Sequence, residues 1–286
     1  MRQKRLLRWL CAVLACLVLV GVGGTVVYHG EWWYPVLWRL SHNDPPNLTV
    51  DTESRACRTW TVEELVAAGA VNSHCLMLVN ASHPLPSDFI PALVEYNGAR
   101  MHPMMLDGYI AMRDGVQDRT GIRIYVASDY RTSEEQKELY EASGSDIAAA
   151  VGCSEHEAGL ALDVYAPYFD GEDFLRSRAG RRVNRVCADY GYIIRYPKGK
   201  ESVTGIDYEP WHLRYVGAPH AAIMSEAGIT LEEYIDLLTP GVRYVSGDYL
   251  ILRCTEDAIL LPESFLSCEI STDNTGYYVV TLRIAA

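Results

Sequence analysis

The distribution of apolar positions separates an uncharged N-terminal run from a longer region of mixed helices and strands. The run covers twenty residues, 9–28. A helix of that length rises about 30 Å, which matches the hydrocarbon core of a bilayer. Four basic residues precede it: Arg2, Lys4, Arg5 and Arg8. Since basic flanks stay on the cytoplasmic side, residues 1–29 are predicted to be a cytoplasmic tip and a membrane-spanning helix, with the rest of the chain outside the cytoplasm.

A cleaved signal peptide is the alternative to a retained anchor. The apolar core of a signal peptide is usually about 7 to 15 residues long and ends in a small-x-small cleavage site. This run is longer, and Gly21 and Gly23 resemble such a site only weakly. We therefore favour an uncleaved anchor.

Residues 30–75 are predicted to be a tether or accessory segment. The stretch SHNDPPNLTVDTES is polar and contains Pro45 and Pro46, which is typical of an extended connector. Thr61 followed by Glu64 is a capping box and predicts one short helix.

Residues 76–239 mix helical and strand periodicity. Apolar residues at near-helical spacing begin after Pro103 and stop at Gly121, which predicts a helix between them. Strands are expected within 122–128, 160–167, 192–197 and 211–217. One further helix is expected to begin at Thr132 or at Ser133, a second to lie within 181–190, and a third to be capped by Thr230. Strands joined by short turns, with helices grouped beside them, predict an α+β domain in which helices pack around an antiparallel sheet.

Beyond Pro240 the pattern changes to short strand-like runs separated by turn residues, which predicts a small β subdomain at 240–286. So small a unit has little stability alone. We expect it to be clipped by Cys254 and Cys268 or to pack on the main domain.

Composition excludes several classes of protein. Hydrophobic residues make up 49% and charged residues 22%, which is typical of a folded globular chain. The formal net charge of -12 argues against nucleic acid as a partner, because binding to phosphate backbones needs clustered Lys and Arg.

The cysteines fit an extracytoplasmic location. Two of the eight, Cys11 and Cys16, fall in the uncharged run. The other six are Cys57, Cys75, Cys153, Cys187, Cys254 and Cys268. In an oxidising compartment they could form three disulfides, whose pairing the sequence leaves open, and buried free thiols are the alternative.

Two motifs contain candidate metal ligands. SEHEAGLALD contains His156 and Asp163, and EPWHLRYVG contains Glu209 and His212. Two imidazoles and one carboxylate suit a tetrahedral Zn²⁺ site with one open position, and the second carboxylate could accept a proton from water there. Asp163 stands inside an apolar run, where an unpaired carboxylate would be costly, so a cation is expected beside it. In a third motif, SDYRTSEEQ, Arg131 could neutralise an oxyanion.

Together these motifs resemble the VanY-type D-alanyl-D-alanine carboxypeptidases of the LAS metallopeptidases, whose pattern is SxHxxGxAxD followed by ExxH. The resemblance covers about residues 76–238. It implies an LAS/hedgehog-like fold, one Zn²⁺ per chain, and a metallopeptidase, not a serine-type enzyme. The implied substrate is a peptidoglycan precursor peptide ending in D-Ala-D-Ala, from which the terminal D-Ala is removed, and the implied location is the outer side of a bacterial cell membrane.

The resemblance also assigns roles by motif. It implies that His156, Asp163 and His212 are the zinc ligands, Glu209 is the general base, and Arg131 stabilises the oxyanion. Two further residues, Gln136 and Ser154, match positions that hold substrate. One departure is Asp129, where the family more often has glycine, and its carboxylate could weaken the cationic role of Arg131 or point to solvent.

Three alternatives remain open from the sequence. A D,D-dipeptidase or a peptidoglycan endopeptidase could use the same site. A non-catalytic, membrane-tethered wall-binding protein could keep the zinc for structure alone, but such a protein would need neither Glu209 nor Arg131. The sequence does not distinguish wall maturation from glycopeptide resistance.

Overall fold

The computed structural model describes residues 30–42, 44–143, 148–256 and 259–284. The membrane-spanning helix expected at 9–28 lies outside these residues. Within them, no helix has both the length and the apolar character needed to cross a bilayer.

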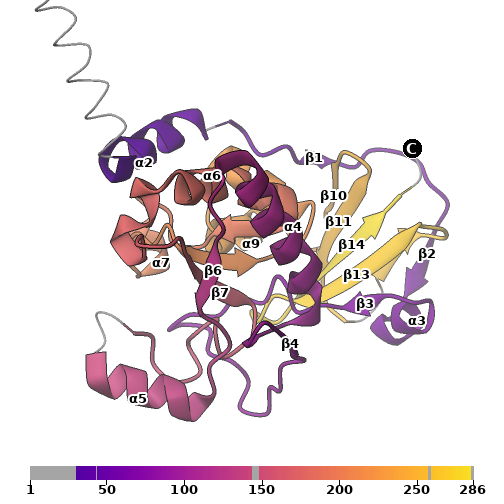
Figure 1. The fold of residues 1–286 in the computed structure, drawn as a ribbon. Coiled ribbons are helices and arrows are strands. Elements are labelled where there is room, and N and C mark those ends of the chain that lie inside the picture. Colours follow the sequence, from indigo (N-terminus) through magenta and orange to yellow (C-terminus); the bar gives the residue numbers. More distant parts are fainter. Residues whose placement is uncertain (1–29, 43, 144–147, 257–258, 285–286) are drawn as a thin grey trace, which may run out of the picture.

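A four-stranded antiparallel sheet forms the centre of the main domain (Figure 1). Its strand order is β6 (Tyr125–Ser128), β7 (Ala161–Tyr165), β9 (His212–Tyr215) and β8 (Tyr192–Ile194). One face packs against α4 (Pro103–Thr120) and α6 (Arg178–Val186) through a core that includes Met105, Leu162, Val164, Val183 and Leu213. The expected α+β domain with an antiparallel sheet is confirmed.

Local signals determine where several helices begin and end. Pro103 occupies the first turn of α4, and Gly121 ends this helix in the left-handed conformation with φ 74°. The capping box predicted at Thr230 is present at the start of α9 (Leu231–Leu237). Helix α4 therefore starts and stops, and α9 starts, where the sequence predicts.

The other elements of the main domain flank the sheet. The hairpin β4 (Val94–Tyr96) and β5 (Ala99–Met101) precedes α4, and α5 (Ser133–Ser143) follows β6. Short helices η1 (Gly171–Arg176), η2 (Cys187–Tyr190), α7 (Glu201–Thr204) and α8 (His220–Ala227) complete this part of the chain.

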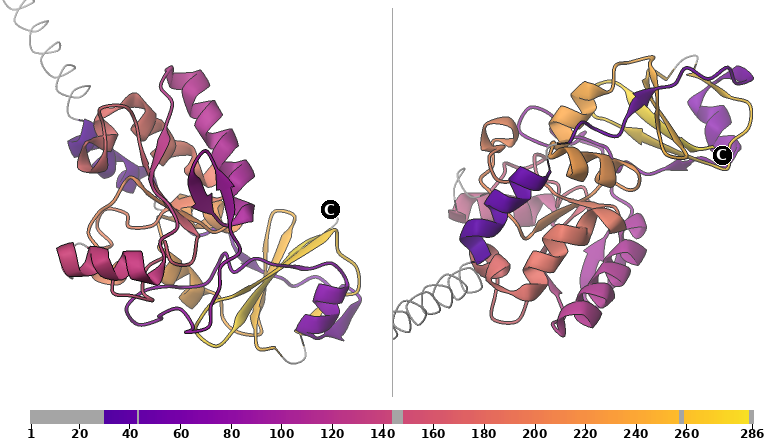
Figure 2. Two further views of the ribbon diagram at one scale, coloured as in Figure 1. Left: turned by 60° about the horizontal axis from the view of Figure 1, so that its bottom comes forward. Right: turned by 90° about the horizontal axis from the view of Figure 1, so that it is seen from above.

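A second sheet contains most of the C-terminal strands. Its order is β1 (Thr49–Val50), β10 (Arg243–Ser246), β11 (Tyr249–Cys254), β14 (Tyr278–Arg283), β13 (Ser267–Thr272) and β3 (Val71–Asn72), while β12 (Ile259–Pro262) pairs with β2 (Cys57–Trp60). Figure 2 shows this sheet beside the main domain. The apolar side chains of α8 and α9 pack against Ile251 and Val279, so the two parts share a core.

Residues 30–75 contribute a helix and strands that the sequence did not predict, and the C-terminal β strands pack on the main domain, which is one of the two expected alternatives. Residues 30–41 form α2 (Gly30–Ser41), which lies against η1 with Tyr34 buried. Strands β1, β2 and β3 pair with strands of the C-terminal segment, and helix α3 (Val62–Ala67) buries Leu65 in the same core as Trp60. The 240–286 sheet would leave edge strands unpaired, and the upstream segment covers them.

The cysteines in the described part of the chain are free thiols. All six candidates outside the uncharged run are unpaired. Cys254 and Cys268 are buried in the core of the C-terminal sheet and are not bonded to each other, so the disulfide clip, one of the two expected alternatives, is absent. Apolar packing of residues such as Trp60 and Leu250 holds this subdomain together instead.

Candidate metal centre

Three donor side chains meet where β7 and β9 run side by side. Asp163 on β7 is directly opposite His212 on β9 in the antiparallel register. His156 lies in the turn before β7, and Gly159 allows that turn by adopting φ +69°. One potential ligand atom from each of His156, Asp163 and His212 lies within 4.8 Å of the other two. The structure therefore brings together the three ligands that the sequence suggests.

The contacts behind each histidine ring determine which nitrogen faces the cluster. His156 Nδ1 is 2.7 Å from the carbonyl oxygen of Asp129, which can only accept, so Nδ1 carries the proton and Nε2 offers a lone pair. His156 Nε2 is 3.3 Å from Asp163 Oδ2. His212 places Nε2 3.5 Å from Glu155 Oε2 and Nδ1 2.9 Å from Asp163 Oδ1. The nitrogen facing Asp163 is thus Nε2 in one ring and Nδ1 in the other.

The electrostatics of this cluster favour a bound positive charge. Burial alone would raise the pKa of Asp163, but the two histidines hold it well below its usual range. Burial alone would lower the pKa of His212, but Asp163 and Glu155 raise it to about 9. Burial lowers the pKa of His156. Two imidazole nitrogens and an ionised carboxylate that converge on one point fit Zn²⁺ better than Ca²⁺ or Mg²⁺, which prefer oxygen ligands.

Glu209 lies next to the three donor residues and is not one of the candidate metal ligands. Its Oε2 is 3.8 Å from His212 Nδ1. Its backbone N–H donates to the carbonyl of Tyr196 at 3.1 Å, and Pro210 follows it in an irregular segment before β9. Burial raises the pKa of Glu209. A carboxylate with a raised pKa at this position is suited to accept and return a proton.

Arg131 is held by three side chains at the end of β6. Its Nε donates to Gln136 Oε1 at 2.8 Å, Nη1 donates to Ser128 Oγ at 2.6 Å, and Nη2 is 3.4 Å from Ser154 Oγ. Burial lowers the pKa of Arg131. Gln136 is fully buried and donates its amide to the carbonyl of Ala149 at 2.7 Å. Gln136 therefore fixes the guanidinium instead of facing the cavity.

One cavity contains the donors and their neighbours. It is lined by Arg131, Leu139, Ala148, Ala149, Ser154, His156, Asp163, Tyr196, Ile206, Glu209, Trp211 and His212. Of the seven residues singled out from the sequence, Gln136 alone lies outside this lining. Asp129 also points elsewhere, because its Oδ2 accepts a hydrogen bond from the backbone N–H of Arg100. Its carboxylate therefore does not compete for Arg131.

A buried charge network behind His212 was missed by sequence reasoning. Glu155 is fully buried, and its Oε1 lies 2.6 Å from Arg195 Nε and 2.7 Å from Arg214 Nη1. Arg195 also pairs with Glu232 at 2.6 Å. Burial would raise the pKa of Glu155, but the two guanidiniums keep it well below its usual range. Both arginines stand inside apolar strand patterns, and this signal could have indicated buried ion pairs.

Comparisons with known proteins agree with this site. The family profile described as VanY, D-alanyl-D-alanine carboxypeptidase, matches residues 98–218. A D-alanyl-D-alanine carboxypeptidase of Enterococcus faecium is 32% identical, over 78% of this chain and 79% of the relative. The bifunctional D-Ala-D-Ala dipeptidase and D-Ala-D-Ala carboxypeptidase VanXYC of Enterococcus gallinarum is 36% identical, over 59% of this chain and 97% of the relative.

Solved structures give the same result. The vancomycin resistance D,D-dipeptidase VanXYg, in complex with a D-Ala-D-Ala phosphinate analog, matches with a TM-score of 0.62 at 27% identity, over 80% of this chain and 99% of that one. The D,D-pentapeptidase VanY from a VanB-type resistance cassette, in complex with Zn(II), matches with a TM-score of 0.51 at 31% identity, over 56% of this chain and 98% of that one. The resemblance drawn from the motifs is confirmed, and the chain belongs to the VanY family of D-alanyl-D-alanine carboxypeptidases.

Proposed function

We propose that this chain is a zinc-dependent carboxypeptidase that removes the terminal D-Ala from peptidoglycan stem peptides ending in D-Ala-D-Ala. The observation that carries the proposal is the placement of Glu209 and Arg131 in the same cavity as the cluster of His156, Asp163 and His212. A purely structural zinc site would need neither a proton acceptor nor a buried guanidinium beside it. The E. faecium relative named D-alanyl-D-alanine carboxypeptidase supports the assignment.

The donor set fits the metal that the family implies. His156, Asp163 and His212 would hold Zn²⁺ and leave one coordination position open. When bound, zinc supplies a Lewis acid and lowers the pKa of water toward about 7.

Glu209 is the proton carrier of the proposed reaction. Its Oε2 lies at the edge of the donor cluster, 3.8 Å from a nitrogen of His212, so a water placed among the donors is within its reach. Burial raises the pKa of Glu209, which makes its carboxylate a better proton acceptor than an exposed glutamate. The same Oε2 would then return the proton to the leaving amine of D-Ala.

Arg131 supplies fixed positive charge on the other side of the cavity. The hydrogen bonds that the guanidinium donates to Ser128 Oγ and Gln136 Oε1 hold it in one orientation before substrate arrives. A preorganised cation stabilises the oxygen of the scissile carbonyl as that oxygen becomes negative. Ser154, which lines the cavity beside Arg131, is suited to contact the substrate.

A D,D-dipeptidase activity on the same site is the second candidate. The similarity to VanXYC, named as both dipeptidase and carboxypeptidase, and to the D,D-dipeptidase VanXYg favours it. The two activities differ in whether the cavity accepts a long stem peptide or the free dipeptide.

We place the catalytic domain outside the cytoplasm, anchored by residues 9–28. The basic residues ahead of this uncharged run support that orientation. The wall substrate lies on the same side of the membrane, so the location agrees with the chemistry. All site residues follow residue 130, so with a single-pass anchor they lie in the external part of the chain.

The proposal is tested by Glu209→Gln, since the amide keeps the shape of the side chain and removes the base. We expect the variant to retain stoichiometric zinc and to lose about 10²- to 10⁴-fold in turnover of a synthetic stem pentapeptide. Mass spectrometry of D-Ala release from the pentapeptide and from free D-Ala-D-Ala separates the two candidate activities. Turnover at the parent rate by a zinc-loaded variant would remove Glu209 from the mechanism.

A further inference from the structure

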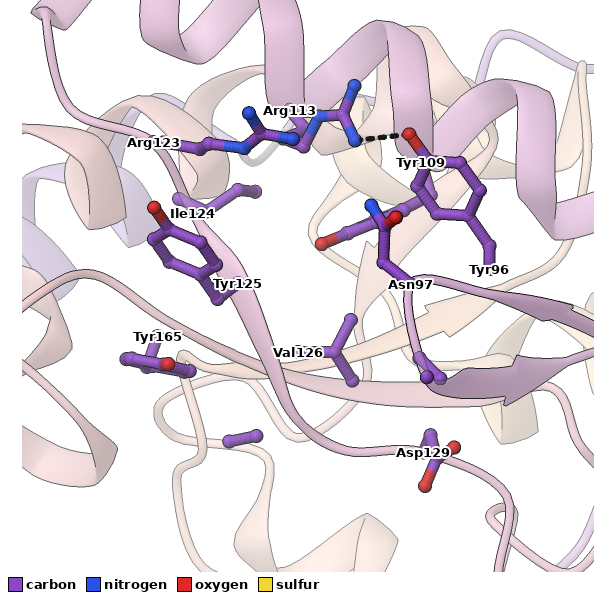
Figure 3. Close-up of a pocket in the computed structure, with 13 residues that line it drawn as sticks. Tyr96, Asn97, Tyr109, Arg113, Arg123, Ile124, Tyr125, Val126, Asp129 and Tyr165 are labelled. Atoms are coloured by element: carbon purple, nitrogen blue, oxygen red, sulfur yellow. Dashed lines mark hydrogen bonds between the residues drawn. The ribbon is translucent and has the colours of Figure 1, made fainter.

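A second, larger cavity of about 540 Å³ opens at the edge of the four-stranded sheet, beside β6 (Figure 3). In Figure 3, Tyr125 and Tyr165 lie on one side of β6, Tyr96 and Asn97 lie on the other, and Arg123 extends above the strand. Its volume falls in the range of about 300 to 1,000 Å³ that is typical of ligand sites. The proposed reaction does not use this cavity.

The aromatic side of this cavity continues the face of the sheet that carries the donor cluster. Side chains alternate between the two faces of a strand, so Tyr165 points to the same face as Asp163, about 7 Å further along β7. Tyr125 pairs with Tyr165 in the register of β6 and β7. Asp129 lies between the two sites, because its carbonyl accepts from His156 while the residue also lines the larger cavity.

Two polar side chains of the cavity remain available to a ligand. In the part of the chain that the structure describes, no hydrogen bond or ion pair engages the Arg123 guanidinium or the Asn97 amide. The guanidinium carbon of Arg123 lies 5.9 Å from the ring centre of Tyr125. The rings of Tyr125 and Tyr165 are 5.6 Å apart and inclined by 31°, and Tyr125 is 42% exposed. The cavity thus offers open aromatic faces beside free hydrogen-bond donors.

The charges of the lining favour a neutral ligand. Arg113 is already engaged, because it pairs with Asp114 at 2.7 Å and donates to the hydroxyl of Tyr96 at 2.6 Å. Among the residues that the structure describes, Arg123 has no ion-pair partner, and Asp129, whose carboxylate accepts from the backbone N–H of Arg100, lines the same cavity. A nucleoside diphosphate would bring at least two negative charges and would meet a single free guanidinium. A sugar ring with apolar faces, hydroxyls and an acetamido group matches the lining better.

We propose that this cavity binds the N-acetylated amino sugar to which a stem peptide is attached, so that the enzyme prefers sugar-linked stems to free peptides. The inference rests on the proposed function and names its substrate class. Four extended residues between the scissile bond and the sugar span about 13 Å. That length covers the path of about 7 Å along β7 to Tyr165 and one strand spacing of about 4.8 Å to β6.

The experiment compares D-Ala release from N-acetylmuramyl-pentapeptide with release from the same pentapeptide lacking the sugar. For the parent we expect kcat/KM to favour the sugar-linked substrate by about 3- to 10-fold, the range of one good aromatic contact. Tyr125→Ala and Arg123→Ala should bring this ratio toward one. Tyr125→Phe keeps the ring and should keep the ratio, and the exposed Arg119, outside the cavity, gives the charge control Arg119→Ala.

A parent ratio near one would overturn the inference, as would a ratio that Tyr125→Ala leaves unchanged. The inference would also be overturned if uridine diphosphate inhibited cleavage of the free peptide and Arg123→Ala relieved that inhibition. This result would assign the cavity to a nucleotide. If neither substrate releases D-Ala, the proposed function fails separately. Calorimetric titration with N-acetylmuramyl-L-alanine, compared between the parent and Tyr125→Ala, still tests the sugar site in that case.

Discussion

Replacing Glu155 by glutamine should weaken both the fold and the metal site. The carboxylate is fully buried and its Oε1 contacts Arg195 at 2.6 Å and Arg214 at 2.7 Å. Removing one partner of a buried ion pair, while the other stays charged and buried, typically costs about 3 to 5 kcal/mol of stability. The glutamine oxygen can still accept one hydrogen bond, and Arg195 keeps Glu232, so we expect a loss near the lower end, about 3 kcal/mol.

The same change should lower zinc affinity through His212. Glu155 Oε2 lies 3.5 Å from His212 Nε2, behind the ring nitrogen that faces the donor cluster. Groups that orient a metal-bound histidine in this way contribute about 10- to 100-fold in metal affinity. Since 3.5 Å is longer than a strong hydrogen bond, we expect a loss of about 10-fold.

Urea unfolding of the metal-free proteins would measure the stability change, and competition with a chromophoric chelator would measure the zinc dissociation constant. Glu157→Gln is the matched control. Glu157 is also buried in the same motif, but it accepts from Ser133 Oγ at 3.0 Å and from the Gly152 N–H at 2.8 Å and does not contact His212. If Glu155→Gln and Glu157→Gln bind zinc equally well, the argument that Glu155 orients His212 is refuted.

Four further outcomes follow from the structure. His156→Ala should lose zinc on dialysis, since two protein ligands make a poor tetrahedral site, and metal content equal to that of the parent would exclude His156 as a ligand. Arg131→Lys should keep zinc and lose about 10²- to 10³-fold in kcat, because an ammonium cannot occupy all three donor positions of the guanidinium; an unchanged kcat would contradict this. Burial lowers the pKa of His220 from its ordinary value of 6.5 to about 3, so the unfolded chain takes up a proton first and stability falls as the pH drops below 6.5. The loss by about pH 5 is about 2 kcal/mol, and the Tm of His220→Gln should depend less on pH than that of the parent. The full chain should remain in the membrane fraction after a salt wash, whereas a mature form beginning after about residue 24 would indicate a cleaved signal peptide.

The parts of the fold that sequence could predict are those set by local signals. Pro103 and Gly121 bound α4 because each restricts or permits the backbone at its own position. No local sequence signal of this kind indicates that β1 and β2 pair with the C-terminal strands. Thr49 pairs with Val245, and these partners lie far apart in the chain, in short strands without a strong alternating pattern. Such pairings depend on which sheet edges remain open after the rest of the chain has folded.

The site also contains residues that the sequence could predict and residues whose roles depend on tertiary packing. His156 and Asp163 lie within one motif, and the chemistry of metal ligands made them visible in the sequence. The contact of Glu155 with Arg195 and Arg214 required knowledge that β8 lies beside β9. The position of Gln136 behind Arg131 also depends on packing, because a glutamine one turn into a helix can face either the cavity or the protein interior.

The buried network gives the C-terminal sheet a part in the metal site. Arg214, which pairs with Glu155 behind His212, also donates from Nη2 to two backbone carbonyls of the segment 75–77, at 3.0 and 2.7 Å. That segment is in turn fixed to β13, because the Leu76 N–H donates to Ser271 Oγ at 2.9 Å. A continuous chain of buried contacts therefore runs from the C-terminal sheet to a proposed zinc ligand, and its last link is the 3.5 Å contact between Glu155 and His212. Because each buried charge in this chain depends on its neighbour for compensation, the sheet stabilises the geometry of the site as well as its own fold.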